Sequence, residues 1–202
     1  MNIIAEIGSN WKDWEQICRM MESLKDIGIH LIKFQLFNKD QVKDLPEYIP
    51  KIITEKWAHQ FFLEGKDLGV DVFFSVCYPE AIPMCERIGV KYYKIRYFDK
   101  DNQEIIQKVV DTGKPWFRSC DVPFIANTKV INLFCVPKYP APIKDYWSWS
   151  GFIGISDHTP DLELYKQIGH LVKYWEMHVK EDDNCLESEW SKKIGDLKSV
   201  LV

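Results

Sequence analysis

Residues 30–37 read HLIKFQLF, a run in which apolar and polar side chains alternate. Alternation with a period of two is typical of a β-strand, so the apolar side chains share one face and Lys33 and Gln35 share the other. The apolar face has to pack on helices, as it does in a parallel sheet that is covered on both sides. We therefore expect Lys33 and Gln35 to point into the interior of a closed barrel.

Similar short β-like runs alternate with amphipathic helical stretches along the whole chain. The expected strands are Asn2–Ile7, His30–Phe37, Asp71–Cys77, Lys91–Ile95, Pro115–Cys120, Val130–Val136, Phe152–Asp157 and Val172–Val179. The expected helices are Trp14–Ile27, Thr54–Leu68, Glu80–Ile88, Asn102–Asp111, Asp161–His170 and Glu187–Val200. This order predicts a parallel sheet closed into a compact (β/α)₈ TIM barrel, with a single domain over residues 1–202.

The chain has 202 residues, which is short for a barrel that typically needs about 250. The chain is expected to be shorter than usual because the helices after the fifth and sixth strands are reduced. No full helix fits Asp121–Thr128, and the stretch Lys138–Ser150 is rich in Pro and Trp.

The composition indicates which classes of partner to exclude. A formal net charge of −4 does not indicate a nucleic-acid-binding protein. The sequence contains no run of 18 apolar residues, so it predicts no membrane-spanning helix. We also find no pattern of a secretory signal. The six cysteines are scattered without a C-x-x-C pair, which favours free thiols and a cytoplasmic protein.

Several charged or polar side chains occupy strand positions that should be buried. A buried charge without a partner costs several kcal/mol, so these groups must pair with each other, with a metal or with a charged ligand. All of them lie near the C-terminal strand ends, where barrel active sites are built. They are Glu6, Lys33, Gln35, Lys94, Ser156, His158, Glu176 and His178.

His158 and His178 form the sharpest pair, because they end consecutive strands and would lie about 4.8 Å apart in the sheet. Imidazole nitrogens at that spacing can converge on one divalent ion at about 2.1 Å, with carboxylate, water or substrate oxygen filling the shell. The alternative is two satisfied histidines at loop edges. His30, His59 and His170 are expected to be structural or solvated.

Seven short motifs, in order across nearly the whole chain, resemble those of the sialic acid synthase family. They are I-A-E-I-G-S-N at 4–10, K-F-Q at 33–35, Y-K-I at 93–95, G-K-P at 113–115, Y-P-A-P at 139–142, G-I-S-D-H-T at 154–159 and E-M-H at 176–178. The resemblance implies a barrel that condenses phosphoenolpyruvate with an N-acetylated aldose, such as N-acetylmannosamine, to give a nonulosonic acid and phosphate. It also implies a form without the C-terminal antifreeze-protein-like domain of that family, and it leaves a homodimer open.

The resemblance also implies roles for individual residues. His158 and His178 match the metal ligands, with Mn²⁺ expected first and Mg²⁺ or Co²⁺ as alternatives. Catalytic roles fall on Glu6, Lys94 and Asp99. Substrate binding falls on Asn10, Lys33, Gln35, Ser75, Arg96, Ser119, Ser156 and either Asp182 or Asp183.

The chain also departs from the family pattern. Tyr97 stands where the family has a serine, Asp99 where it has a glutamate, and Val76 and Pro137 where it has polar groups. New basic groups that could compensate are Arg96, Arg118 and Lys138. Two other functions therefore remain open: a related keto-acid aldolase or lyase barrel, and a non-catalytic barrel that binds a sugar or phosphate.

Overall fold

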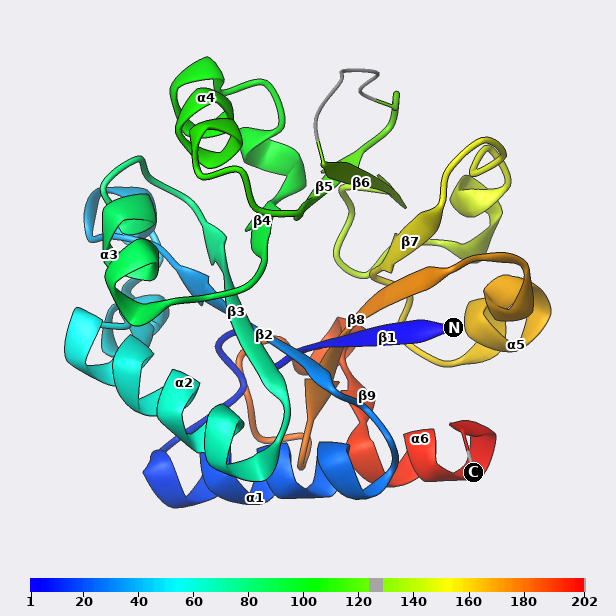
Figure 1. The fold of residues 1–202 in the computed structure, drawn as a ribbon. Helices are drawn as coiled ribbons and strands as arrows, with labels where there is room; N and C mark the ends of the chain where they lie inside the picture. The colour runs from blue at the N-terminus through cyan, green and yellow to red at the C-terminus, as the bar shows by residue number, and fades with distance from the viewer. Residues whose placement is uncertain (124–128, 202) are drawn as a thin grey trace.

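The computed structural model describes residues 1–123 and 129–201, and eight of its strands form a closed parallel barrel. Each strand pairs with the next one along the chain, and β1 also pairs with β8, which closes the ring (Figure 1). The strands are β1 Asn2–Glu6, β2 Leu31–Leu36, β3 Asp71–Val76, β4 Tyr93–Ile95, β5 Trp116–Cys120, β6 Val130–Cys135, β7 Gly154–Asp157 and β8 Tyr174–Lys180. The expected TIM barrel is confirmed.

The α-helices lie outside the ring of strands (Figure 1). They are α1 Trp14–Asp26, α2 Glu55–Leu68, α3 Ala81–Ile88, α4 Gln103–Asp111, α5 Glu163–Ile168 and α6 Ile194–Leu201. Short 3₁₀ turns join them: η1 Asp40–Val42, η2 Pro46–Lys51, η3 Tyr97–Asp99, η4 Ile143–Tyr146, η5 Gly169–Leu171 and η6 Ser188–Trp190. The first helix begins where the Asp13 side chain accepts a hydrogen bond from the backbone N–H of Gln16, a common N-cap arrangement.

The predicted closing helix Glu187–Val200 is wrong in its first half. That segment forms η6 and then a two-residue strand, β9 Lys192–Lys193, which pairs with the end of β8. The helix begins only at Ile194. Tertiary pairing with β8 overrides the local helical pattern, and it buries the Lys192 side chain outside the barrel.

The fifth and sixth helices were expected to be reduced. Part of the first stretch, residues 124–128, lies outside the described residues. Between β6 and β7 the described chain has only the four-residue turn η4. Its Tyr146 packs edge-on against Phe134 of β6, which also contacts Phe152, so aromatic side chains cover this strand in place of a helix.

Expectations from composition can be compared with these elements. The longest helix, α2, has 14 residues, and within residues 1–123 and 129–201 no helix is long and apolar enough to cross a membrane. All six cysteines are free thiols. Four of them are buried and pack as small apolar side chains: Cys77, Cys85, Cys120 and Cys135.

The interior of the barrel is layered, because inward-facing positions recur at every second residue of each strand. The layer beneath the cavity is an apolar cluster of Ile4, Phe73, Phe117 and Leu133. Two residues further along the same strands come buried side chains that line a cavity: Glu6, Ser75, Ser119 and Cys135. The alternation of side chains along each strand thus places a polar cavity directly above an apolar layer.

Gly154 gives a test of how tightly this apolar layer is packed. A Cβ at Gly154 would meet the Leu133 side chain and the Tyr174 carbonyl oxygen, each at 2.6 Å. We expect Gly154→Ala to lower the free energy of unfolding by about 1–3 kcal/mol, measured by urea denaturation. Gly195→Ala is the matched control, because nothing lies within 4 Å of its added Cβ. Equal losses in both variants would contradict the packing argument.

Candidate active site

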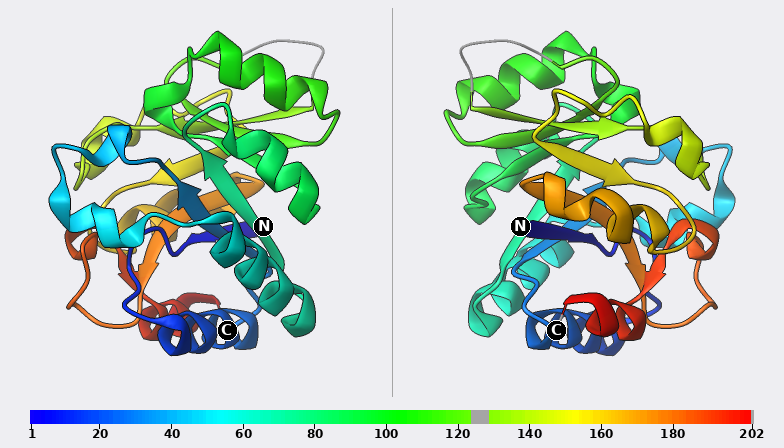
Figure 2. Two further views of the ribbon diagram at one scale, coloured as in Figure 1. Left: turned by 90° about the vertical axis from the view of Figure 1, so that its left-hand side faces the viewer. Right: turned by 90° about the vertical axis from the view of Figure 1, so that its right-hand side faces the viewer.

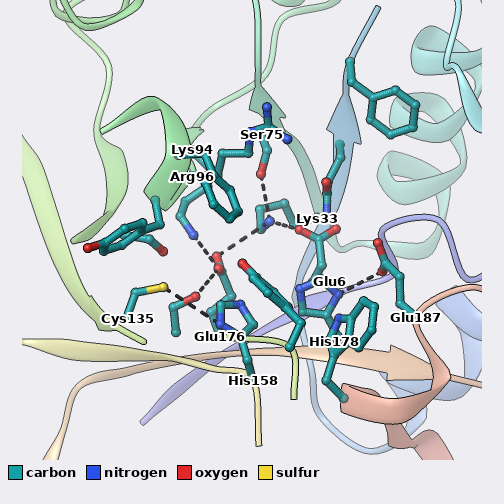
Figure 3. A pocket seen from close by; sticks show the side chains of 18 of the residues that line it. Glu6, Lys33, Ser75, Lys94, Arg96, Cys135, His158, Glu176, His178 and Glu187 are labelled. Atoms are coloured by element: carbon teal, nitrogen blue, oxygen red, sulfur yellow. Dashed lines mark hydrogen bonds and ion pairs between the residues drawn. The ribbon is translucent and has the colours of Figure 1, made fainter. Parts of the chain in front are cut away.

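A cavity of about 320 Å³ opens at the C-terminal end of the barrel strands (Figure 3). The segment between β2 and α2, which holds η1 and η2, lies over this end (Figure 2) and contributes Gln41, Leu45 and Tyr48 to the lining. The predicted site residues that line the cavity are Glu6, Lys33, Gln35, Ser75, Lys94, Arg96, Ser119, Ser156, His158 and His178. The alternation of side chains along the strands therefore places most of the predicted site residues around one cavity.

Three predicted site residues do not line this cavity. Asn10 is buried beside it, where its amide group donates to the Val179 carbonyl at 2.9 Å and to Ser191 Oγ at 2.8 Å. Asp183 is exposed and pairs with Lys180 at 2.9 Å. Asp99 is outside the cavity lining, and its carboxylate accepts a hydrogen bond from Arg96. The structure thus places these three residues outside the cavity lining, and their roles stay predictions.

Two of the three basic groups expected to compensate for lost ligands also lie elsewhere. Arg118 is on the outer face of β5, where it donates to the Lys100 carbonyl at 2.9 Å. Lys138 is exposed and pairs with Asp145 at 2.6 Å. Of this group of three, Arg96 alone lines the cavity.

The floor of the cavity holds two buried lysines with acidic partners. Lys33 contacts Glu6 and lies 2.8 Å from Ser75 Oγ, and Lys94 contacts Glu176. Burial lowers the pKa of Lys33 to about 7. Burial alone would raise the pKa of Glu176, but the two lysines outweigh it and hold that pKa at about 2. Glu176 is therefore ionised at neutral pH where it pairs with Lys94, whereas Lys33 can exchange a proton there.

Two hydroxyls complete the floor. Ser156 Oγ donates to Glu176 at 2.9 Å. The buried Ser119 Oγ has no hydrogen-bond partner in the part of the chain that the structure describes. A buried hydroxyl that faces a cavity without a partner is suited to a ligand oxygen, because an unpaired buried polar group is costly.

His158 and His178 come together above this floor, with ring centroids 5.4 Å apart. Nδ1 of His158 lies 3.1 Å from the Val136 carbonyl oxygen, and Nδ1 of His178 lies 2.9 Å from Glu187 Oε2. A carbonyl or a carboxylate oxygen accepts, so each Nδ1 donates. Burial, with His178 nearby, lowers the pKa of His158 well below its usual range and keeps it neutral.

His158 therefore presents the lone pair of Nε2, the neutral form of His178 would do the same, and this donor set fits a divalent metal. Metal-bound histidines usually donate their other ring N–H to a carboxylate or a carbonyl, as these two do. Within residues 1–123 and 129–201 no group of three or more His, Cys, Asp or Glu side chains surrounds one point. A metal at this pair would take its remaining ligands from water or substrate.

The segment around His158 is braced from outside the barrel. Ser156 and His158 point inward, and the alternate residues Asp157 and Thr159 point outward to Lys192 of β9. The Lys192 ammonium lies 3.2 Å from Asp157 Oδ2 and donates to the Thr159 carbonyl at 2.6 Å. All three outward residues are buried, so the brace is part of the folded frame.

Sequence reasoning missed several residues of the cavity. Glu187 is the most important, because it orients His178 and is itself buried. The local pattern predicts a helix that begins at Glu187, and this prediction gives no reason to expect its side chain at the cavity. Sequence reasoning also missed the aromatic side chains on one side of the cavity. The ring centroid of Tyr139 lies 4.3 Å from that of His158 and 5.4 Å from that of Trp190.

Comparisons with known proteins bear on the family and on the fold. A sequence model described as the NeuB family matches residues 20–185. The chain is 23% identical to the pseudaminic acid synthase of Helicobacter pylori, over 78% of this chain and 58% of that protein. The chain thus spans less than two thirds of that relative's length.

Solved structures share the fold. The N-acetylneuraminic acid synthetase of Leptospira borgpetersenii matches with a TM-score of 0.85 at 22% identity, over 98% of this chain and 80% of that chain. A truncated 3-deoxy-D-arabino-heptulosonate 7-phosphate synthase of Thermotoga maritima matches with a TM-score of 0.70 at 11% identity, over 99% and 83% of the two chains. At these identities the structural matches establish the barrel alone.

Proposed function

Because the chain belongs to the NeuB family, we propose that its barrel condenses phosphoenolpyruvate with an N-acetylated aldose. The methylene carbon of phosphoenolpyruvate joins the aldehyde carbon of the sugar. Water adds at the carbon that carries the phosphate, and inorganic phosphate leaves. One aldose, one phosphoenolpyruvate and one water thus give one nonulosonic acid and one phosphate.

The observation that carries this proposal is the pair of buried lysines beside the histidine pair. Phosphoenolpyruvate has about three negative charges, and charge-assisted hydrogen bonds are the strong ones for such a group. Lys94 and Lys33 supply cations at the floor, and Ser119 and Ser156 supply hydroxyls. These groups would bind its phosphate and carboxylate and stabilise the charge that develops as phosphate leaves.

The aldehyde oxygen gains negative charge as the carbon–carbon bond forms, so it needs a proton. We assign its delivery to the Lys33–Glu6 pair, because burial lowers the pKa of Lys33 to about 7 and Glu6 contacts it. A group that titrates near the working pH both gives and takes back a proton readily. Gln35 lies two residues along the same inward face, where it would contact the sugar.

His158 and His178 would hold a divalent metal, with Mn²⁺ as the first candidate. When bound, such an ion acts as a Lewis acid on an oxygen of the substrate. Glu187 and the Val136 carbonyl keep each histidine in the tautomer that can bind it. Tyr139 and Trp190 pack beside the pair and would limit the access of water to a bound metal.

Titration calorimetry with phosphoenolpyruvate, into metal-free protein and into protein loaded with Mn²⁺, tests this function. We expect binding in the loaded protein and, with N-acetylmannosamine added, release of one phosphate for each nonulosonic acid seen by mass spectrometry. Absence of binding in both forms would reject the condensation. It would favour a keto-acid aldolase or lyase, or a non-catalytic barrel, in which the changes at Tyr97 and Pro137 have removed the phosphate ligands.

A further inference from the structure

Arg96 is a cation in the cavity wall that takes no part in the ion pairs of the cavity floor. It follows Lys94 by two residues, and its backbone is still extended (φ −74°, ψ 166°), so its side chain also lines the cavity (Figure 3). Its side chain is 32% exposed, whereas those of Lys33 and Lys94 are 3% and 2% exposed. Arg96 thus belongs to the mouth of the cavity and the two lysines to its floor.

The donors of Arg96 are mostly unused. Its Nε donates to Asp99, which is 13% exposed and lies outside the cavity lining. Among the described residues its two terminal nitrogens have no hydrogen-bond partner. By contrast, Lys33 and Lys94 each contact a carboxylate in the floor. A guanidinium held at Nε presents its remaining edge as a planar fork, which suits two oxygens of one anionic group.

The depth of Arg96 indicates which substrate it meets. This step rests on the proposed function, in which the sugar aldehyde has to reach the floor beside the histidines. The rest of the sugar then extends toward the mouth, so the end remote from the aldehyde lies near Arg96. At the mouth, Phe98 and Tyr139 stack with ring centroids 6.3 Å apart and restrict the space beside it.

We propose that the acceptor aldose carries a phosphate ester or a carboxylate at the end remote from its aldehyde, and that the free edge of Arg96 binds this group. Arg96 would then determine specificity between charged and neutral acceptors. The competing role is that Arg96 binds the phosphate of phosphoenolpyruvate in place of the serine lost at Tyr97. The depth difference between Arg96 and the lysines favours the acceptor.

Three acceptor probes separate these roles: N-acetylmannosamine, its 6-phosphate and the corresponding 6-carboxylate, N-acetylmannosaminuronic acid. We expect at least one charged probe to bind the wild-type protein about tenfold or more tighter than the neutral sugar, by titration calorimetry. Arg96→Gln should remove that preference, and Arg96→Lys should keep part of it, because it retains the charge without the fork. Arg87→Gln, an exposed arginine paired with Glu55, is the matched control and should keep the preference.

The inference is overturned if the neutral sugar binds as well as both charged probes, or if the preference survives in Arg96→Gln. It is also overturned if that variant loses affinity for phosphoenolpyruvate as strongly as for the charged sugar. Turnover of each probe with phosphoenolpyruvate and Mn²⁺ is scored separately. An Arg96-dependent preference without turnover would reject the condensation and support anion recognition, whereas turnover without any preference would reject anion recognition alone.

Discussion

Replacing His158 with alanine should abolish Mn²⁺ binding and turnover together. His158 presents one of the two imidazole nitrogens at the cavity, because its other nitrogen is engaged with the Val136 carbonyl. Removing an outer partner of a metal ligand already costs about 10–100-fold in affinity, so removing the ligand should cost more than about 100-fold. Titration calorimetry measures the Mn²⁺ affinity, and phosphate release measures the turnover.

His59→Ala is the control for this variant, since His59 is an exposed histidine on α2. It should bind Mn²⁺ and turn over as the wild type does. Full turnover by His158→Ala, with Mn²⁺ binding lost, would remove the metal from the proposed reaction. Unchanged Mn²⁺ binding would remove His158 from the metal site.

Replacing Lys94 with methionine should weaken phosphoenolpyruvate binding by about 10–100-fold, the range for a lost hydrogen bond between charged groups. Lys94 is buried at the floor and contacts Glu176, which also lies 3.8 Å from Lys33. Because Lys33 remains near that carboxylate, Glu176 is not left without a cation, and the fold should persist. Calorimetry on metal-free protein gives the affinity, and thermal denaturation gives the melting temperature.

Lys192→Met is the matched control, because Lys192 is equally buried but pairs with Asp157 outside the cavity. It should lower the melting temperature while the affinity of the metal-free protein for phosphoenolpyruvate stays within about threefold, a change below 1 kcal/mol. If Lys94→Met instead lowered the melting temperature strongly and left the affinity unchanged, Lys94 would be structural.

The strand residues of the site could be predicted from the sequence because a strand has a fixed period. Once Lys33 and Gln35 were assigned to an inward face, the same parity placed His158 and His178 at the cavity. The structure confirms those positions, and the roles of the residues stay predictions. Nothing more than the alternation of side chains was needed to find them.

The loop residues could not be placed in this way, because the period holds only as far as the first residue after a strand, as at His158 after β7. Strand β4 ends at Ile95, so Asp99 falls in the turn η3, where it pairs with Arg96 outside the cavity lining. Glu187 was hidden in an apparently helical stretch that instead pairs with β8 through β9. In both cases long-range contacts, which a local pattern does not contain, determine the position.

The brace formed by Asp157, Thr159 and Lys192 has a consequence for any alanine scan of this chain. Consecutive residues of this short motif alternate between the cavity and the outer face of the barrel. Substitutions at neighbouring positions therefore test different things: one tests a group at the cavity, and the next tests the support of that group. Loss of turnover in Asp157→Ala would report a displaced histidine rather than a missing chemical group. Within residues 156–159, only the even-numbered positions can report chemistry directly.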